Sequence, residues 1–232
     1  AAIDAALVTF TQSGTGAVTT TVQAKLREGA VSAADFSTVA QAVATGKDVF
    51  FPAGTWSFDQ VIVTTPRQRF YGVGPAAIVR ASDATKDLFL VRAADVRFSD
   101  LRMEGASTSE TNGTFAIKTD SAYPAPRLRI ENVQFSGADS SKGFNNGVKF
   151  DTGADYGTVY GCYFERLWGN DSGYGYGVLC GAAEGVVAEA NSGIGTAGRG
   201  RHFIYFSSGA AHCKAIGNDS EGFDSSAIAI YA

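Results

Sequence analysis

Hydrophobic and polar residues alternate along short segments of this chain, and these segments recur at a nearly constant interval. Residues 147–165 read GVKFDTGADYGTVYGCYFE and residues 203–221 read FIYFSSGAAHCKAIGNDSE, with matching apolar positions at a shift of 56 residues (203 − 147). A shorter copy lies between them at residues 177–193, so the repeat is half that shift, 28 residues. Apolar positions spaced two apart indicate β-strands rather than helices. A repeat of this length built from strands predicts a solenoid.

Two sets of apolar positions recur in successive repeats and are expected to stack in the core. The first set marks one strand of each repeat: Phe98, Ile130, Val159, Val187 and Ala215. The second set marks another strand and consists of pairs two residues apart: Phe115 and Ile117, Val148 and Phe150, Val178 and Cys180, Ile204 and Phe206, Ile228 and Ile230. Because side chains alternate across a strand, both members of a pair point to the same side. We therefore predict an all-β fold, a right-handed parallel β-helix.

The residues before the repeats predict a cap. Phe36, Val39, Ala40 and Val43 follow helical spacing, and Gly46 is a stop signal. Such a helix would cover the open end of the solenoid, where edge amides would otherwise be exposed. The predicted organisation is listed from the N-terminus: an arm at 1–33, a capping helix at 34–46 and a β-helix at 47–232, with the protein expected to continue beyond Ala232.

Composition and charge exclude several classes of function. The chain has 232 residues, of which 45% are hydrophobic and 18% charged, with a formal net charge of −4. Basic residues are not clustered, which argues against nucleic acid as a partner. No apolar run approaches the roughly 20 residues that a membrane span needs, so we expect no membrane insertion. Cys162, Cys180 and Cys213 lack the spacing of a metal site. We expect Cys162 and Cys180 to be core thiols, and we expect no cofactor and no metal.

The N-terminal quarter carries a family resemblance. The segments VTFTQSGTGAVTTTVQAKLRE, VSAADF and VFFPAGTWSF, within residues 8–58, resemble phage tailspike and tail-fibre proteins that contain a pectate-lyase-like right-handed β-helix. The matching positions are Gly14 to Val18, Lys25 to Glu28, Val31, Ser32, Asp35, Phe36, Pro52, Gly54 and Trp56. The family usually continues after Asp-Phe with a Gly-Asp-Gly-type loop and a longer helix, and that loop is missing here.

This resemblance implies a location, partners and an activity. It implies a homotrimer in the phage virion that acts at the bacterial surface on a capsule or lipopolysaccharide. The arm at 1–33 would then contact other tail or baseplate proteins. We expect a depolymerase, with hydrolysis favoured over elimination. A non-catalytic receptor-binding or structural fibre is an alternative, and a bacterial pectate-lyase-like enzyme is another. The junction at residues 25–36 favours the phage interpretation over the bacterial enzyme.

One column of the repeats offers candidate catalytic acids. The column is Glu104, Ser136, Glu165, Gly193 and Glu221. Glu165 and Glu221 are expected to flank the small Gly193 at about 9–10 Å, near the upper end of the spacing in inverting glycosidases. One glutamate, buried under Trp168, would be the acid and the other would activate water. Solvated charges on the edge of a solenoid are the alternative. Asp171 and Asp224 are further candidate acids.

A long polar insertion beside this column predicts sugar binding. Residues 166–177 read RLWGNDSGYGYG and supply aromatic rings for stacking and polar groups for hydroxyls. Its candidate substrate-binding residues are Trp168, Asn170, Tyr174 and Tyr176. Arg201 and His202 are placed to meet an acidic sugar. Exposed aromatic residues also occur at subunit contacts, and a trimer interface is the alternative use of this loop.

Overall fold

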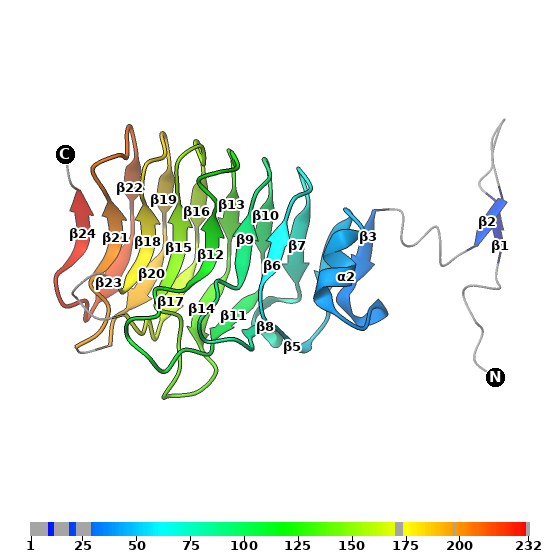
Figure 1. Ribbon diagram of the computed structural model, residues 1–232, viewed down its shortest axis with the longest axis horizontal. Coiled ribbons are helices and arrows are strands. Elements are labelled where there is room, and N and C mark those ends of the chain that lie inside the picture. The colour runs from blue at the N-terminus through cyan, green and yellow to red at the C-terminus, as the bar shows by residue number, and fades with distance from the viewer. Residues whose placement is uncertain (1–8, 12–18, 22–28, 170–173, 197, 231–232) are drawn as a thin grey trace.

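Three long sheets dominate the computed structural model, which describes residues 9–11, 19–21, 29–169, 174–196 and 198–230 (Figure 1). Sheet 1 contains β3 (Ala30–Ser32), β4 (Asp48–Phe51), β7 (Arg69–Gly72), β10 (Arg97–Ser99), β13 (Arg129–Glu131), β16 (Thr158–Tyr160), β19 (Val187–Glu189) and β22 (Lys214–Ile216). Sheet 2 contains β5 (Gly54–Phe58), β8 (Ala77–Ala81), β11 (Arg102–Gly105), β14 (Gln134–Gly137), β17 (Tyr163–Glu165), β20 (Ser192–Ile194) and β23 (Asp219–Glu221). Sheet 3 contains β6 (Val61–Val63), β9 (Phe89–Val91), β12 (Phe115–Thr119), β15 (Asn146–Phe150), β18 (Tyr176–Cys180), β21 (His202–Phe206) and β24 (Ser226–Ile230).

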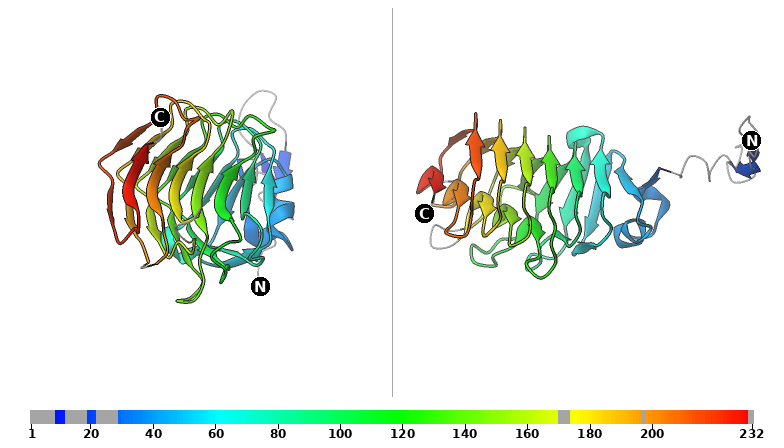
Figure 2. Two further views of the ribbon diagram at one scale, coloured as in Figure 1. Left: turned by 60° about the vertical axis from the view of Figure 1, so that its left-hand side comes forward. Right: turned by 90° about the horizontal axis from the view of Figure 1, so that it is seen from above.

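From β4 onward the chain visits the three sheets in turn, and each passage through them is called a coil here. Neighbouring strands within each sheet pair in parallel, for example β13 with β16, β14 with β17 and β15 with β18. The coils therefore stack along one axis, as the view from above shows (Figure 2). The predicted fold class, an all-β parallel β-solenoid, is confirmed.

The core consists of columns of apolar side chains that stack from coil to coil. Phe70 stacks on Phe98 with ring centroids 4.9 Å apart, and Phe135 stacks on Phe164 at 4.5 Å. Six residues of the predicted columns are buried, as the sequence required: Val148, Phe150, Val178, Cys180, Ile204 and Phe206. Cys162 is also buried.

The predicted register is wrong at two places. In sheet 1, Ala188 rather than Val187 pairs with Val159, because the preceding connection is one residue longer than a constant repeat allows. In sheet 3, Ile117 pairs with Val148, whereas Phe115 pairs with Asn146. The inner pair of β12 is therefore Ile117 and Thr119. The long connection before β12 shifts this strand by two residues relative to the repeat.

The turns between sheets use the left-handed backbone region. In each of five coils one residue with a positive φ turns the chain from sheet 1 into sheet 2: Asp100, Asn132, Gly161, Ala190 and Gly217. Asparagine, aspartate and glycine adopt this conformation at low cost. The corner from sheet 3 into sheet 1 repeats the device, with Asp95, Arg127, Tyr156, Gly185 and His212.

The capping helix is present but shorter than predicted. It is α2 (Val39–Ala44), preceded by the 3₁₀ helix η1 (Ala33–Asp35), and a second 3₁₀ helix, η2 (Gly74–Ala76), follows β7. Thr38 caps α2 because its Oγ1 accepts from Gln41 N at 3.3 Å. Phe36 lies before the helix in extended conformation, and Ala40 is exposed, so these two residues are not on the buried face.

The helix is fixed to the solenoid at its C-terminal end. The buried Gln68 donates from Nε2 to Val43 O at 3.0 Å and to Lys47 O at 2.6 Å. Val39, Ala42 and Val43 are buried against the first coils. Two further short strands, β1 (Thr9–Thr11) and β2 (Thr19–Thr21), pair antiparallel within the predicted N-terminal arm. Most of that arm lies outside the described residues.

Candidate functional site

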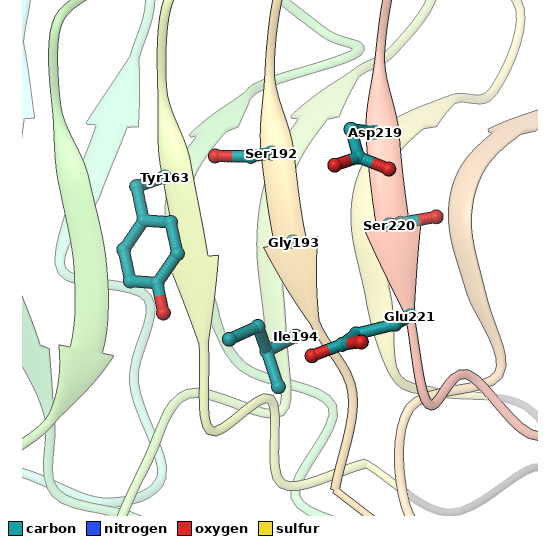
Figure 3. A pocket seen from close by; sticks show the side chains of 7 residues that line it. All are labelled: Tyr163, Ser192, Gly193, Ile194, Asp219, Ser220 and Glu221. Carbon is teal, nitrogen blue, oxygen red and sulfur yellow. The ribbon is translucent and has the colours of Figure 1, made fainter.

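A shallow groove of about 260 Å³ lies on the outer face of sheet 2, across β17, β20 and β23. Its lining is drawn in Figure 3: Tyr163, Ser192, Gly193, Ile194, Asp219, Ser220 and Glu221. Alternate residues of a strand point to the same side, so Asp219 and Glu221 both face outward. The side chain of Glu221 extends toward β20 (Figure 3).

The two predicted glutamates share a column, but a different residue separates them. Glu165 pairs with Ile194, and Ile194 pairs with Glu221. Parallel strands lie about 4.8 Å apart, so the two glutamate Cα atoms lie about 9–10 Å apart. The predicted notch at Gly193 is wrong, because Ile194, which is 42% exposed, lies between the glutamates.

Gly193 lines the floor of the groove but belongs to the inward-facing column of sheet 2. It pairs with Phe164 and Ser220, which belong to the inward-facing column of sheet 2. A Cβ atom at this position would lie 2.6 Å from the ring of Phe203. The ring of Phe203, which comes from sheet 3, therefore occupies the space that a side chain at position 193 would need.

Tyr163 lies beside the carboxylates at the edge of the groove. Burial raises the pKa of its phenol, and the negative charge of Glu165 raises it further. A hydrogen bond from the phenol to the Glu165 side chain acts in the same direction. The groove combines this donor with Ser192, the carboxylates of Asp219 and Glu221 and the apolar surface of Ile194, whereas Glu165 is not part of its lining.

Trp168 is not the exposed platform that the sequence predicted. It is buried, and its Nε1 donates to Thr108 O at 3.2 Å. The guanidinium of Arg199 lies 3.5 Å from the centre of its ring and is paired with Glu110, with Nε 3.0 Å from Oε1. Connections from three coils thus enclose the indole. Trp168 does not line the groove or cover either glutamate.

Three predicted substrate-binding residues gather at the start of the strands of sheet 3. The ring centroid of Tyr176 lies 6.0 Å from that of His202. Arg201 donates from Nη1 to the hydroxyl of Tyr176 at 3.2 Å. Tyr205 completes the cluster, with its ring centroid 5.3 Å from Tyr176 and 5.2 Å from His202. The sequence analysis missed Tyr205, although its polar-side position in HFIYF was a signal for it.

His202 is held in its neutral form. Burial lowers the pKa of its imidazole, and the positive charge of Arg201 lowers it further. Its Nδ1 lies 2.6 Å from the Oγ of Ser226 on the next coil. A neutral imidazole beside Arg201 leaves the guanidinium as the positive charge of the cluster. Tyr176 is buried, so the half-buried Arg201, His202 and Tyr205 are the members of the cluster that a ligand could contact.

The remaining candidate residues lie in different parts of the structure. Asp224 is exposed on the connection from β23 to β24, and its Oδ1 accepts from Gly198 N at 3.3 Å. Tyr174 packs against Gly113 in a neighbouring connection. Asn170 and Asp171 lie outside the described residues. Glu165, Glu221 and Asp224 end or follow strands of sheet 2, while Arg201, His202 and Tyr176 begin strands of sheet 3, so both groups border the same set of connections.

The part of the chain that the structure describes contains no group of three or more histidine, cysteine, aspartate or glutamate residues that could hold a metal ion. Asp120 and Asp151 are instead paired with Arg92 and Lys149, at 2.7 Å and 2.6 Å. Within the same described residues, no helix is long and apolar enough to cross a membrane.

Several solved structures share this fold. The enzymatically active domain of tailspike protein 2 from bacteriophage CBA120 matches 93% of this chain, with a TM-score of 0.65 and 16% sequence identity. Phage tailspikes are among the structural neighbours. Full-length tailspike protein 2 of an Escherichia coli O157:H7 bacteriophage matches the same share at 15% identity and a TM-score of 0.58. The catalytic domain of a GH87 α-1,3-glucanase in complex with tetrasaccharides matches 88% of this chain, with 12% sequence identity and a TM-score of 0.55.

The match covers most of this chain but only part of each neighbour. The chain spans 33% and 30% of the two tailspike chains and 39% of the glucanase chain. At these identities the likeness shows the fold. No protein-family model and no curated protein matches the sequence. The resemblance to tailspikes noted in the sequence is confirmed at the level of the fold.

Proposed function

We propose that this chain is the β-helix of a phage tailspike or tail fibre that binds a bacterial surface polysaccharide and cleaves it. The observation that carries the proposal is the groove on sheet 2, where carboxylates, a protonated phenol and an apolar side chain share one outer face. The likeness to a tailspike's enzymatically active domain over 93% of the chain supports it. The polysaccharide is a capsule or a lipopolysaccharide.

Glu165 and Glu221 are proposed as the acid–base pair of a hydrolase. Side chains rooted about 9–10 Å apart can bring their carboxyl groups within the 6.5–9.5 Å that inverting glycosidases use to hold a water molecule. One carboxyl group would protonate the leaving oxygen, and the other would activate the water. Asp219 lies on the same outer face as Glu221 and is proposed as a third candidate acid beside the pair.

Tyr163 is proposed to bind the substrate and not to act as the base of an elimination. A lyase needs a base that removes a proton from the sugar. The pKa of the phenol is raised, which makes the tyrosinate rarer near neutral pH. Tyr163 therefore suits the binding of a sugar hydroxyl better than proton abstraction.

The cluster of Tyr176, Arg201, His202 and Tyr205 is proposed as a second contact for the glycan. It lies across the connections from the groove, so a chain of several sugars could reach both surfaces. Aromatic rings meet the apolar faces of sugars, and Arg201 suits a carboxylate on an acidic sugar.

A non-catalytic receptor-binding fibre is the second candidate, and one observation favours it. Ile194 lies between the two glutamates, where an inverting hydrolase needs space for its water. If a bound sugar packs on Ile194 without admitting that water, the groove binds and does not cleave.

The test is incubation of purified protein with a panel of bacterial capsular and lipopolysaccharide glycans, followed by sizing of the products. We expect the wild type to shorten one glycan, and Glu165→Gln and Glu221→Gln to slow this by about 10²–10⁴-fold. Glu189→Gln, on the outer face of sheet 1, is the matched control and should keep full activity. An unsaturated sugar end in the products would contradict hydrolysis.

Binding without shortening by the wild type would establish the second candidate instead. Full activity of both glutamine variants would contradict the proposed pair, and Asp219→Asn would then test the third acid. Neither binding nor cleavage across a panel that includes the host's own glycans would contradict the proposed function itself.

Trimeric assembly in the virion, at the surface of the bacterial host, belongs to the same proposal. Tyr160 and Ile216 are exposed in one column of sheet 1, and Tyr156 is exposed at the neighbouring corner. These residues suit a subunit contact. Light scattering should give the mass of three chains, and a stable monomer at micromolar concentration would contradict the trimer. The arm at 1–33 is proposed to contact other tail or baseplate proteins.

A further inference from the structure

Two cysteine side chains touch each other at the corner where sheet 3 leads into sheet 1. The Sγ atoms of Cys180 and Cys213 lie 3.6 Å apart, and both thiols are free. Cys180 ends β18, whereas Cys213 immediately precedes β22. The contact therefore joins the end of one coil to the start of the next but one, and the segment between the two cysteines contains the whole coil of β19, β20 and β21.

The two sulfur atoms share one small space. Sγ of Cys180 lies 3.5 Å from Ala183 O, and Sγ of Cys213 lies 3.6 Å from the same oxygen. A disulfide bond is about 2.0 Å long, so the two atoms must approach by about 1.5 Å. Cys213 can supply this movement, because it leads into β22, the last described strand of sheet 1, which pairs on one side with β19.

The third cysteine lies elsewhere and provides a comparison. Cys162 belongs to the corner between sheets 1 and 2, with its Sγ 3.5 Å from Tyr160 O and 3.6 Å from Ile130 O. It is buried between coils on both sides. Cys162 differs from the touching pair in one respect: it has no second cysteine sulfur atom within reach.

We propose that Cys180 and Cys213 form an intramolecular disulfide when the protein meets a small disulfide such as oxidised glutathione. The bond would be a covalent staple between the coil that contains β18 and the coil that contains β22. It is independent of the proposed activity.

The reaction proceeds by two exchanges. Cys213 is half-buried and reacts first: its thiol gives its proton to water, and the thiolate sulfur attacks one sulfur of the small disulfide and releases one small thiolate. Cys180 then loses its proton and attacks the sulfur of Cys213, which releases the second small thiolate. Both released thiolates take up protons. In total, two protein thiols are oxidised and one small disulfide is reduced to two thiols.

Burial governs the rate of the second exchange. It raises the pKa of the Cys180 thiol to about 12, so its thiolate is rare in the closed structure. Exchange therefore requires local opening of the coil of β22, β23 and β24 around Cys213. We expect slow oxidation, over hours, that accelerates under conditions that loosen this coil.

The test uses the full chain, purified with reductant and then incubated with oxidised glutathione. Remaining thiols are alkylated under denaturing conditions and counted by intact mass. We expect three alkylated thiols before oxidation and one afterwards, with a Cys180–Cys213 linked peptide on mapping. Cys162→Ser should still lose two thiols, whereas Cys213→Ser should lose none to an internal bond.

The staple should also be visible in the native protein. Oxidation should raise the unfolding temperature by a few degrees and slow amide exchange in residues 202–230, and a dithiol reductant should reverse both changes. Cys213→Ser should show neither change. To separate slow kinetics from an impossible bond, the oxidation is repeated during refolding from denaturant. Three free thiols after both treatments, or a bond that involves Cys162 or a second chain, would overturn the proposal.

Discussion

The coil of β13, β14 and β15 and the coil of β22, β23 and β24 occupy equivalent places in the repeat but differ in burial. Ile130, Phe135 and Phe150 of the inner coil are fully buried. The positions that follow in the same columns of the outer coil are Ala215, Ser220 and Ile230, of which the first two are half-buried and Ile230 is 72% exposed. Burial in a solenoid is thus set by coils on both sides, not by the strand sequence alone.

The same comparison separates residues that stabilise the fold from residues of the candidate site. The inner coil contributes large buried rings, and the ring of Phe135 stacks on Phe164 of the next coil. The candidate groove lies across β17, β20 and β23, toward the outer coil, and consists of side chains on the outer face. Substitutions in the inner coil should therefore lower stability strongly and activity little. Substitutions near the groove should lower activity strongly and stability little.

The largest expected effect is on the inner coil. Phe135→Ala removes a fully buried ring that stacks on Phe164 at 4.5 Å. We expect the free energy of unfolding to fall by about 3–5 kcal/mol, because a cavity remains between two fixed coils. Chemical denaturation measures this loss. Phe223→Ala, a half-buried ring of the outer coil, is the control and should cost less. Equal losses would contradict the comparison.

Loss of a buried polar side chain should also distinguish the inner from the outer coils, with a smaller effect on stability. The buried Asn191 accepts from Cys162 N at 2.9 Å and donates to Val159 O at 3.0 Å. Asn191→Ala leaves both backbone groups without these partners, and we expect a loss of about 1–3 kcal/mol in unfolding free energy. Asn218→Ala makes the same change one coil further out, where the side chain is half-buried. A loss at Asn218 as large as that at Asn191 would show that the outer coil is as well packed as the inner ones.

The pH dependence of stability should reveal the lowered pKa of His202. Its pKa is lower in the folded protein than in the unfolded chain, so the unfolded chain binds the proton more strongly. The contribution of His202 is complete above pH about 6.5 and is lost as the pH falls through the folded-state pKa. We expect His202→Gln to flatten the unfolding-temperature profile across this window relative to wild type. Parallel profiles would contradict a lowered pKa.

The smallest expected effect is at the end of the solenoid. Ile230→Ser replaces a residue that is 72% exposed, and we expect a change within about 0.5 kcal/mol in unfolding free energy. Thermal unfolding of both proteins at equal concentration measures it. A loss of several kcal/mol would show that a further part of the protein or another subunit packs on this coil.

Much of the fold followed from the sequence, because the same strand pattern occurs in several successive repeats. The period of 28, the spacing of two and the buried columns at Val148, Val178 and Ile204 could all be obtained from apolar positions alone. Asp100, Asn132 and Gly161 fitted the turns because these residue types adopt a positive φ at low cost. Glu165 and Glu221 share a column, as the sequence predicted.

Only the tertiary structure decided how the connections fit between the strands. Ile194, not Gly193, separates the glutamates, because one residue more or less in a turn moves a side chain from the outer face to the core. Trp168 is buried by Thr108 and Arg199, and the contact between Arg199 and Glu110 spans 89 residues. A local pattern carries no information on contacts between connections of different coils, since those depend on the length and path of each loop. The repeat determined the solenoid, and the irregular loops determined its surface.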